Sequence, residues 1–213
     1  MAVNDLKALF TVIFGFALVE AVKSVFRIQE ANIFVLIDNV PQAISLAFTL
    51  LPFFQGNTRF LDDRYLNESD IQTFDGIVEY FMFLLQGVIF YALALLIPNP
   101  LYFYNVFIVL FGVDVIWLVH SFYSTRKEIR KLKTWGFLNT GMVFVLLLLV
   151  DGNIMNNNEW KWITITFTLI TRTMLDYGLT WEFYWPNVTK KKSKDKEAEA
   201  NNKSMQIPVS KQL

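Results

Sequence analysis

The chain has 213 residues, of which 54% are hydrophobic and 18% charged, whereas a soluble domain carries about 25% charged residues. Its 19 Lys and Arg residues balance 19 Asp and Glu residues, so the chain lacks the net basic charge of a nucleic-acid-binding protein. It has no Cys and a single His, which excludes disulfides, Cys-ligated metals and sites with several His ligands. These proportions predict a polytopic membrane protein without a metal or another cofactor.

Six hydrophobic segments follow one another along the chain. They cover residues 6–26, 33–54, 74–97, 102–123, 135–150 and 160–185. A helix needs about 20 residues to cross a hydrocarbon core of about 30 Å, and lipid cannot satisfy an open backbone edge. The sequence therefore predicts an all-α fold, a bundle of about six transmembrane helices. We expect residues 1–188 to form this domain and residues 189–213 to form a flexible basic tail.

The basic residues predict how the chain is oriented, because Lys and Arg are enriched in cytoplasmic loops. Five lie between the fourth and fifth segments, at Arg126, Lys127, Arg130, Lys131 and Lys133, and seven more follow the sixth segment. Both regions are expected in the cytoplasm, and counting segments back places the N-terminus there too. Aromatic residues near segment ends are expected to anchor the bundle at the membrane interfaces. They are Trp135, Trp160, Trp162, Trp181, Trp185, Tyr102, Tyr104, Tyr123 and Tyr184.

Polar and ionisable residues inside the segments are the best functional candidates, because a charge at the centre of a bilayer costs roughly 2.5–3.5 kcal/mol. The candidates for a permeation path or a buried polar network are Glu20, Lys23, Asp38, Gln42, Glu79, Asp114, Arg172 and Asp176. Helical spacing places Asp38, Gln42, Ser45 and Thr49 on one stripe. Glu20, Lys23 and this stripe are expected in the outer half, and the remaining charges in the inner half.

Arg172 is the deepest full charge and stays ionised, so it needs a carboxylate partner. Asp176 can supply one from the same helix, and Asp114 or Glu79 could supply one from another. Proline residues also interrupt the second segment, at Pro41 and Pro52. The backbone carbonyls that they leave without donors have to be satisfied by a neighbouring helix or a cavity.

The stretch of residues 55–73 is the one sizeable polar loop expected inside the chain, on the cytoplasmic side. Its charged residues Arg59, Asp62, Asp63 and Arg64 are candidates for docking a protein partner. Arg59 and Asp63 are four residues apart, so a helical extension of the second segment would pair them. The adjacent Asp62 and Asp63 could also bind a divalent cation, but the further oxygen ligands cannot be assigned, and the salt-bridged extension is favoured.

Three functions fit these patterns, beside a purely structural role of the buried charges in helix packing. The leading hypothesis is a small channel or transporter for an ion or small polar solute, working as a homo-oligomer. The second is a membrane-embedded adaptor, sensor or effector subunit that binds a cytoplasmic protein. The third is an enzyme acting on lipid headgroups through Asp62, Asp63, Asp75 and Glu79. The spacing of these carboxylates matches no catalytic pattern, so no catalytic residue is assigned. The first partner that we expect is the lipid bilayer, because the chain is predicted to span it.

Overall fold

The computed structural model describes residues 3–29, 32–65, 73–124, 130–152 and 158–185. Its helices are α1 (Val3–Val25), α2 (Val40–Tyr65), α3 (Thr73–Leu96), α4 (Pro100–Ser124), α5 (Arg130–Val150), α6 (Asn158–Leu179) and the short α7 (Trp181–Tyr184). An antiparallel hairpin of β1 (Phe26–Gln29) and β2 (Asn32–Val35), followed by the 3-10 helix η1 (Ile37–Asn39), joins α1 to α2. The predicted helical fold is confirmed for nearly all of these residues, and the expected tail at 189–213 lies outside them.

The hairpin is the one departure from the expected helices. The second segment was expected to be helical from residue 33, but residues 32–35 form β2 and the helix begins at Val40. Ile28 pairs with Ile33 and Phe26 with Val35, so apolar residues stand opposite one another in the register. Pro41 lies in the first turn of α2, where its missing N–H costs no helical hydrogen bond.

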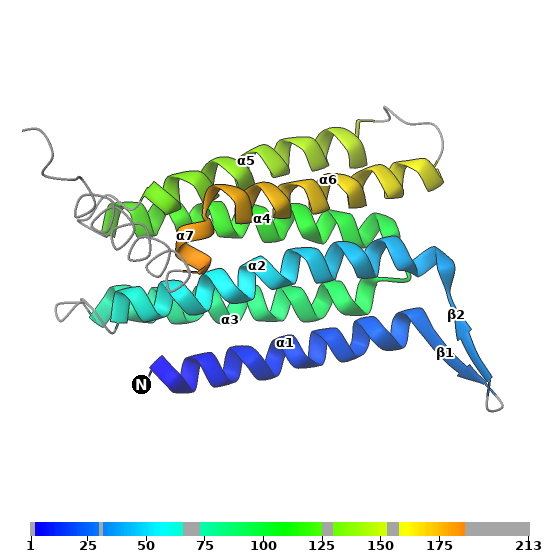
Figure 1. Ribbon diagram of the computed structural model, residues 1–213, viewed down its shortest axis with the longest axis horizontal. Helices are drawn as coiled ribbons and strands as arrows, with labels where there is room; N and C mark the ends of the chain where they lie inside the picture. The colour runs from blue at the N-terminus through cyan, green and yellow to red at the C-terminus, as the bar shows by residue number, and fades with distance from the viewer. Residues whose placement is uncertain (1–2, 30–31, 66–72, 125–129, 153–157, 186–213) are drawn as a thin grey trace, which may run out of the picture.

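The six long helices lie side by side, and the chain runs back and forth along the bundle (Figure 1). Each helix packs against two neighbours in the order α1, α3, α4, α5, α6, α2 and back to α1, and α2 also touches α3. The hairpin lies at one end of the bundle, which we call the hairpin end. The first residues of α1 and the whole of α7 lie at the other end, called here the α7 end (Figure 1).

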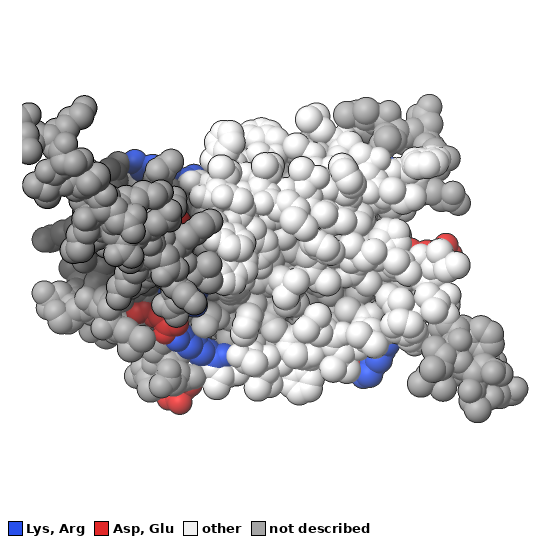
Figure 2. All heavy atoms as spheres, viewed as in Figure 1, with Lys and Arg blue, Asp and Glu red and all other residues white. Residues whose placement is uncertain are grey.

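The outer surface of the bundle is apolar. Large hydrophobic side chains such as Phe81, Phe137 and Phe167 are more than half exposed. On the face shown in Figure 2, the charged side chains that are described lie near the two ends, with a wide band free of them between. Among the described residues, four helices are long and apolar enough to cross a membrane, over Asp5–Val25, Gly76–Leu96, Pro100–Tyr123 and Leu132–Val150. These features support an integral membrane protein, while the six spans and their orientation stay predictions.

Candidate functional site

Helix α6 has its polar face inside the bundle and its apolar face outside. Its buried polar residues are Lys161, Thr166, Arg172, Thr173 and Asp176. Its exposed large side chains are Trp160, Ile163, Phe167, Met174, Leu175 and Leu179. A helix on the surface of a water-soluble protein shows the reverse arrangement. This inverted pattern brings hydrogen-bonding and charged groups together in the interior, where the other helices have to supply their partners.

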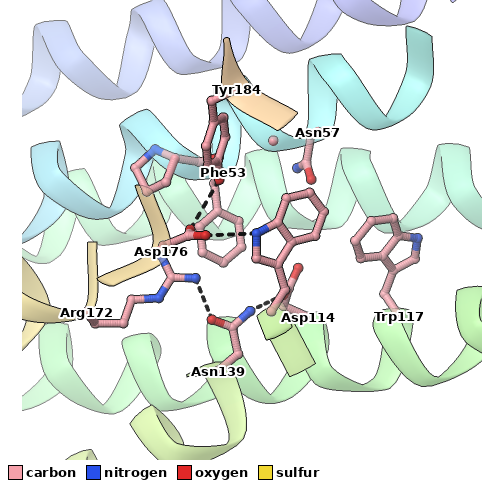
Figure 3. A pocket seen from close by; sticks show the side chains of 11 residues that line it. Phe53, Asn57, Asp114, Trp117, Asn139, Arg172, Asp176 and Tyr184 are labelled. Carbon is pink, nitrogen blue, oxygen red and sulfur yellow. Dashed lines mark hydrogen bonds and ion pairs between the residues drawn. The ribbon is translucent and has the colours of Figure 1, made fainter. Parts of the chain in front are cut away.

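A chain of hydrogen bonds crosses the bundle from α2 to α6. Asn57 Nδ2 donates to Gln86 Oε1 at 2.7 Å, and Gln86 Nε2 donates to Asp114 Oδ1 at 2.8 Å. Asn139 Nδ2 donates to the other oxygen of Asp114, while Arg172 Nη2 donates to Asn139 Oδ1 at 2.6 Å (Figure 3). The Asn139 amide therefore works as donor and acceptor at once, and its orientation is set by both neighbours.

Asp176 completes this arrangement on the other side of Arg172. Its Oδ2 lies 3.3 Å from Arg172 Nη1, so Arg172 has the partner expected from its own helix. Trp135 Nε1 donates to Asp176 Oδ1 at 2.8 Å, and Tyr184 OH donates to Oδ2 at 3.2 Å (Figure 3). Thr180 Oγ1 lies 3.1 Å from Oδ1. We call Asn57, Gln86, Asp114, Asn139, Arg172 and Asp176 the central network. It holds two carboxyl groups and one guanidinium group.

A small cavity lies within the central network. It has a volume of about 20 Å³ and is lined by Asp114, Arg172 and Asp176 together with Trp135 and Tyr184, among others. That volume suits about one water molecule, and the polar lining offers it hydrogen-bond partners. Gly56 also lines the cavity, and a Cβ there would lie 3.4 Å from Tyr184 OH and 3.5 Å from the Trp135 ring. The missing side chain therefore leaves room for the two aromatic donors of Asp176.

A second polar group lies nearer the hairpin end. The hydroxyl groups of Ser45, Tyr104 and Thr166 lie within 3.0–3.2 Å of one another, and we call these residues the outer cluster. Aromatic rings fill the space between the two polar groups. Along α4, the Tyr104, Phe107 and Phe111 rings follow at centroid distances of 6.2 and 6.1 Å, and the Arg172 guanidinium lies 5.5 Å from the Phe111 centroid. The outer cluster and the central network are called the two polar layers below, and the rings of Phe107 and Phe111 are called the aromatic layer between them.

The structure brings only some of the predicted polar residues into the interior. Gln42, Ser45 and Thr49 are all buried, but Asp38, at the start of the same stripe, is exposed in η1. Glu20 and Lys23 form an ion pair of 2.7 Å on the exposed surface of α1, apart from both polar layers. Glu79 is fully buried on α3, two turns before Gln86, and is not among the residues that line the cavity.

The predicted docking residues lie on a helix. Residues 59–64 belong to α2, which extends to Tyr65 as the favoured interpretation of this stretch expected. Asp62 forms an ion pair with Lys7 of α1, and the side chains of Asp63, Arg64 and Asp75 lie outside the described part of the structure. Among the described side chains, no three His, Cys, Asp or Glu groups are placed to hold a metal ion.

Three aromatic residues that were expected at the membrane interfaces are buried inside the bundle. Trp135 and Tyr184 were expected as interface anchors, but they are 6% and 1% exposed and bind Asp176. Tyr104, another expected anchor, is buried in the outer cluster, whereas Trp160 and Tyr123 are exposed. Asn57 and Asn139 were not singled out. The sequence did contain a signal for both residues, because an amide side chain in a membrane helix indicates a hydrogen bond in the interior of the bundle.

Comparisons with protein-family models, curated proteins and solved structures found no match for this chain. Its function has to be inferred from the interior polar groups themselves.

Proposed function

We propose that all six long helices span a bilayer and that the polar interior moves a small cation or a proton across it. The observation that carries this proposal is the placement of Arg172 between two carboxyl groups. Asp176 contacts the guanidinium directly, and Asp114 is joined to it through Asn139. The cavity that suits about one water molecule lies among the same side chains.

The inverted pattern of α6 supports the six spans. Helices α2 and α6 have 26 and 22 residues, so they are about 39 and 33 Å long and can cross a core of about 30 Å. Their polar residues make them less apolar than the other four long helices, but several of these residues, such as Thr49, Arg172 and Asp176, are buried inside the bundle. A helix whose exposed side is apolar and whose buried side is polar suits a lipid surrounding.

The charge balance supports a cation as the moving species. With both carboxyl groups ionised, the central network carries one negative charge more than Arg172 neutralises. An unbalanced charge in a low-dielectric interior is costly, so the site favours a proton or a small cation that removes the excess. The cavity has room for an ion or a water molecule and excludes larger solutes.

In this conformation the proposed path is closed, because the aromatic layer separates the two polar layers. Phe107 and Phe111 are fully buried between the outer cluster and the central network. A narrow apolar layer excludes water and thereby stops ions, which is how hydrophobic gates close channels. Movement of a cation between the two polar layers therefore requires these rings to shift, as in a gated channel or a transporter.

Flux from liposomes that contain the purified protein tests this proposal. A proton gradient and an alkali-cation gradient are imposed separately, and the dissipation of each is followed with a dye. We expect the wild-type protein to dissipate one of them, Asp114→Asn to abolish that flux, and Phe107→Ala to increase it. Asp62→Asn is the matched control, since Asp62 lies outside both polar layers. A folded, inserted protein without flux, or equal flux in Asp114→Asn and the control, contradicts the proposal.

The spans are tested separately by cysteine labelling, because the natural chain has no Cys that could react. Ile37 is exposed at the hairpin end, and Tyr123 is exposed at the α7 end. In sealed vesicles, a membrane-impermeant maleimide should label Ile37→Cys and Tyr123→Cys from opposite sides. Asp151→Cys, at the end of α5, should behave like Ile37→Cys. Labelling of all three from one side contradicts the six spans.

A further inference from the structure

We propose that a groove between α4 and α5 binds one anionic phospholipid molecule. The groove is a second cavity, of about 290 Å³, separate from the one in the central network. It is lined by Leu118, Phe122, Leu132, Lys133, Gly136 and Thr140, among others. This site does not depend on the proposed cation movement, since none of these residues belongs to the two polar layers.

The groove opens on the outside of the bundle. Phe122 and Val119 on one wall are 40% and 51% exposed, while Leu118 and Leu132 at its floor are 3% exposed. Gly136 contributes no side chain, and a Cβ at this position would meet nothing within 4 Å. The groove is therefore a space on the apolar surface that the protein's own side chains leave unfilled, and in a membrane it faces acyl chains.

The polar end of the groove matches an anionic headgroup. Lys133 lies in the first turns of α5, near the α7 end, with its Nζ 5.5 Å from the centroid of the Phe122 ring. The sequence from 126 to 133 holds five basic residues and one acidic residue, so the charge of this region is positive. A positive charge of this kind near a membrane surface attracts anionic lipids.

The direction of the groove suits an acyl chain, and its length suits the first half of one. From Lys133 to Thr140 the lining of α5 advances seven residues, or about 10 Å along the helix. On α4 the lining extends over the same length, from Phe122 back to Val115, because α4 runs in the opposite direction to α5. A phosphate group at Lys133 would thus leave its chain running past Gly136 toward the middle of the bundle. One lipid satisfies both the charge at the end and the apolar walls.

Native mass spectrometry of the full-length protein in detergent, titrated with phosphatidylglycerol or phosphatidylcholine, tests the site. The wild-type protein should bind phosphatidylglycerol more tightly. Lys133→Gln should weaken phosphatidylglycerol binding about fivefold and leave phosphatidylcholine binding unchanged, as expected for one basic residue at a membrane surface. Lys133→Arg, which keeps the charge, should retain the preference. Lys23→Gln is the control, because Lys23 is an exposed lysine on α1, away from the groove.

A second pair of variants tests the apolar part of the groove. Gly136→Leu fills the groove and should weaken the binding of both lipids. Gly141→Leu adds the same side chain on α5, where a Cβ also meets nothing within 4 Å, but outside the groove lining, and should have no effect. Both positions have open space, so both variants should fold, which thermal melting verifies. Equal binding of the two lipids by the wild type, or equal losses in a variant and its control, overturns the proposal.

Discussion

Thr173 donates a hydrogen bond from its side-chain hydroxyl to the backbone oxygen of Phe48, at 2.8 Å. Phe48 lies four residues before Pro52, which has no N–H with which to bond that carbonyl within α2. The proline thus creates an acceptor inside the bundle, and α6 supplies the donor. The sequence predicted that a neighbouring helix or a cavity would satisfy such a carbonyl, and here a neighbouring helix does.

Thr173→Val removes this donor and keeps the shape of the side chain. We expect a loss of about 0.6 kcal/mol, and at most about 1.7 kcal/mol, in the free energy of unfolding, because these are the average and the maximum measured for hydrogen bonds between membrane helices. Unfolding in mixed detergent micelles, followed by circular dichroism, measures it. Thr171→Val is the control, because Thr171 is exposed and its hydroxyl bonds within its own helix, to Phe167 O.

A double-mutant cycle with Pro52→Ala separates this bond from general packing. Alanine restores an N–H for the Phe48 carbonyl, so Thr173→Val should cost less in the Pro52→Ala background than in the wild type. Identical costs in the two backgrounds would show that Thr173 does not act through this carbonyl.

Asp176→Leu should destabilise the protein more than Arg172→Leu. Without Arg172, Asp176 keeps its hydrogen bonds from Trp135 and Tyr184, and the two carboxyl groups can each be neutralised by a proton. An unpaired guanidinium cannot lose its charge in this way. Without Asp176, Arg172 loses the carboxylate that it contacts, and breaking a buried ion pair from one side typically costs about 3–5 kcal/mol. Asp114→Leu should fall between the two, since Arg172 reaches Asp114 only through Asn139. Melting of the three detergent-solubilised variants gives the order, and an Arg172→Leu variant that is the least stable refutes this pairing.

Trp135→Phe removes the indole N–H that Asp176 accepts at 2.8 Å. The ring remains, so its edge-on contact with Phe183 is retained. We expect a loss of about 1 kcal/mol in the free energy of unfolding, with Asp176 left short of one donor. Trp181→Phe, at a tryptophan that is 47% exposed, should change stability much less. Equal effects of the two substitutions would mean that Trp135 acts as an apolar surface residue.

Gly87→Ala should weaken the packing of α1 on α3. A Cβ at Gly87 would lie 3.1 Å from Ile13 Cγ2 and 3.3 Å from Cδ1, closer than ordinary contact. Overpacking of this kind typically costs about 1–3 kcal/mol. Ile13→Ala in the same chain should restore part of the loss by making room, and Gly15→Ala, where the Cβ meets nothing within 4 Å, serves as the control. Alanine gains up to about 1 kcal/mol over glycine in any helix, so the comparison is with Gly15→Ala, and equal stabilities of the two variants would contradict this close approach.

The sequence located the third and fourth helices well, because each depends on a long apolar stretch and on local backbone bonding, whereas the second segment, at 33–54, was placed too early for α2 (Val40–Tyr65). The boundaries of the third and fourth segments differ from α3 and α4 by at most two residues. The hairpin of β1 and β2 was not predicted, because a short apolar run is compatible with a helix and with a strand. The antiparallel pairing of the two strands, as between Phe26 and Val35, is a contact that periodicity does not reveal.

By itself the sequence determined the membrane class, the helices and the need of Arg172 for a carboxylate, since these follow from composition, periodicity and charge. Only the tertiary structure decided which polar groups meet. It joined Asp114 to Arg172 through Asn139, buried Trp135 and Tyr184 beside Asp176, and left Glu20 and Lys23 on the surface. The physical reason is that a helix specifies the faces of its own residues, whereas their partners depend on how neighbouring helices are rotated and shifted. A hydrogen bond needs its donor and acceptor atoms within roughly 3.2 Å of one another, so that relative placement decides each contact.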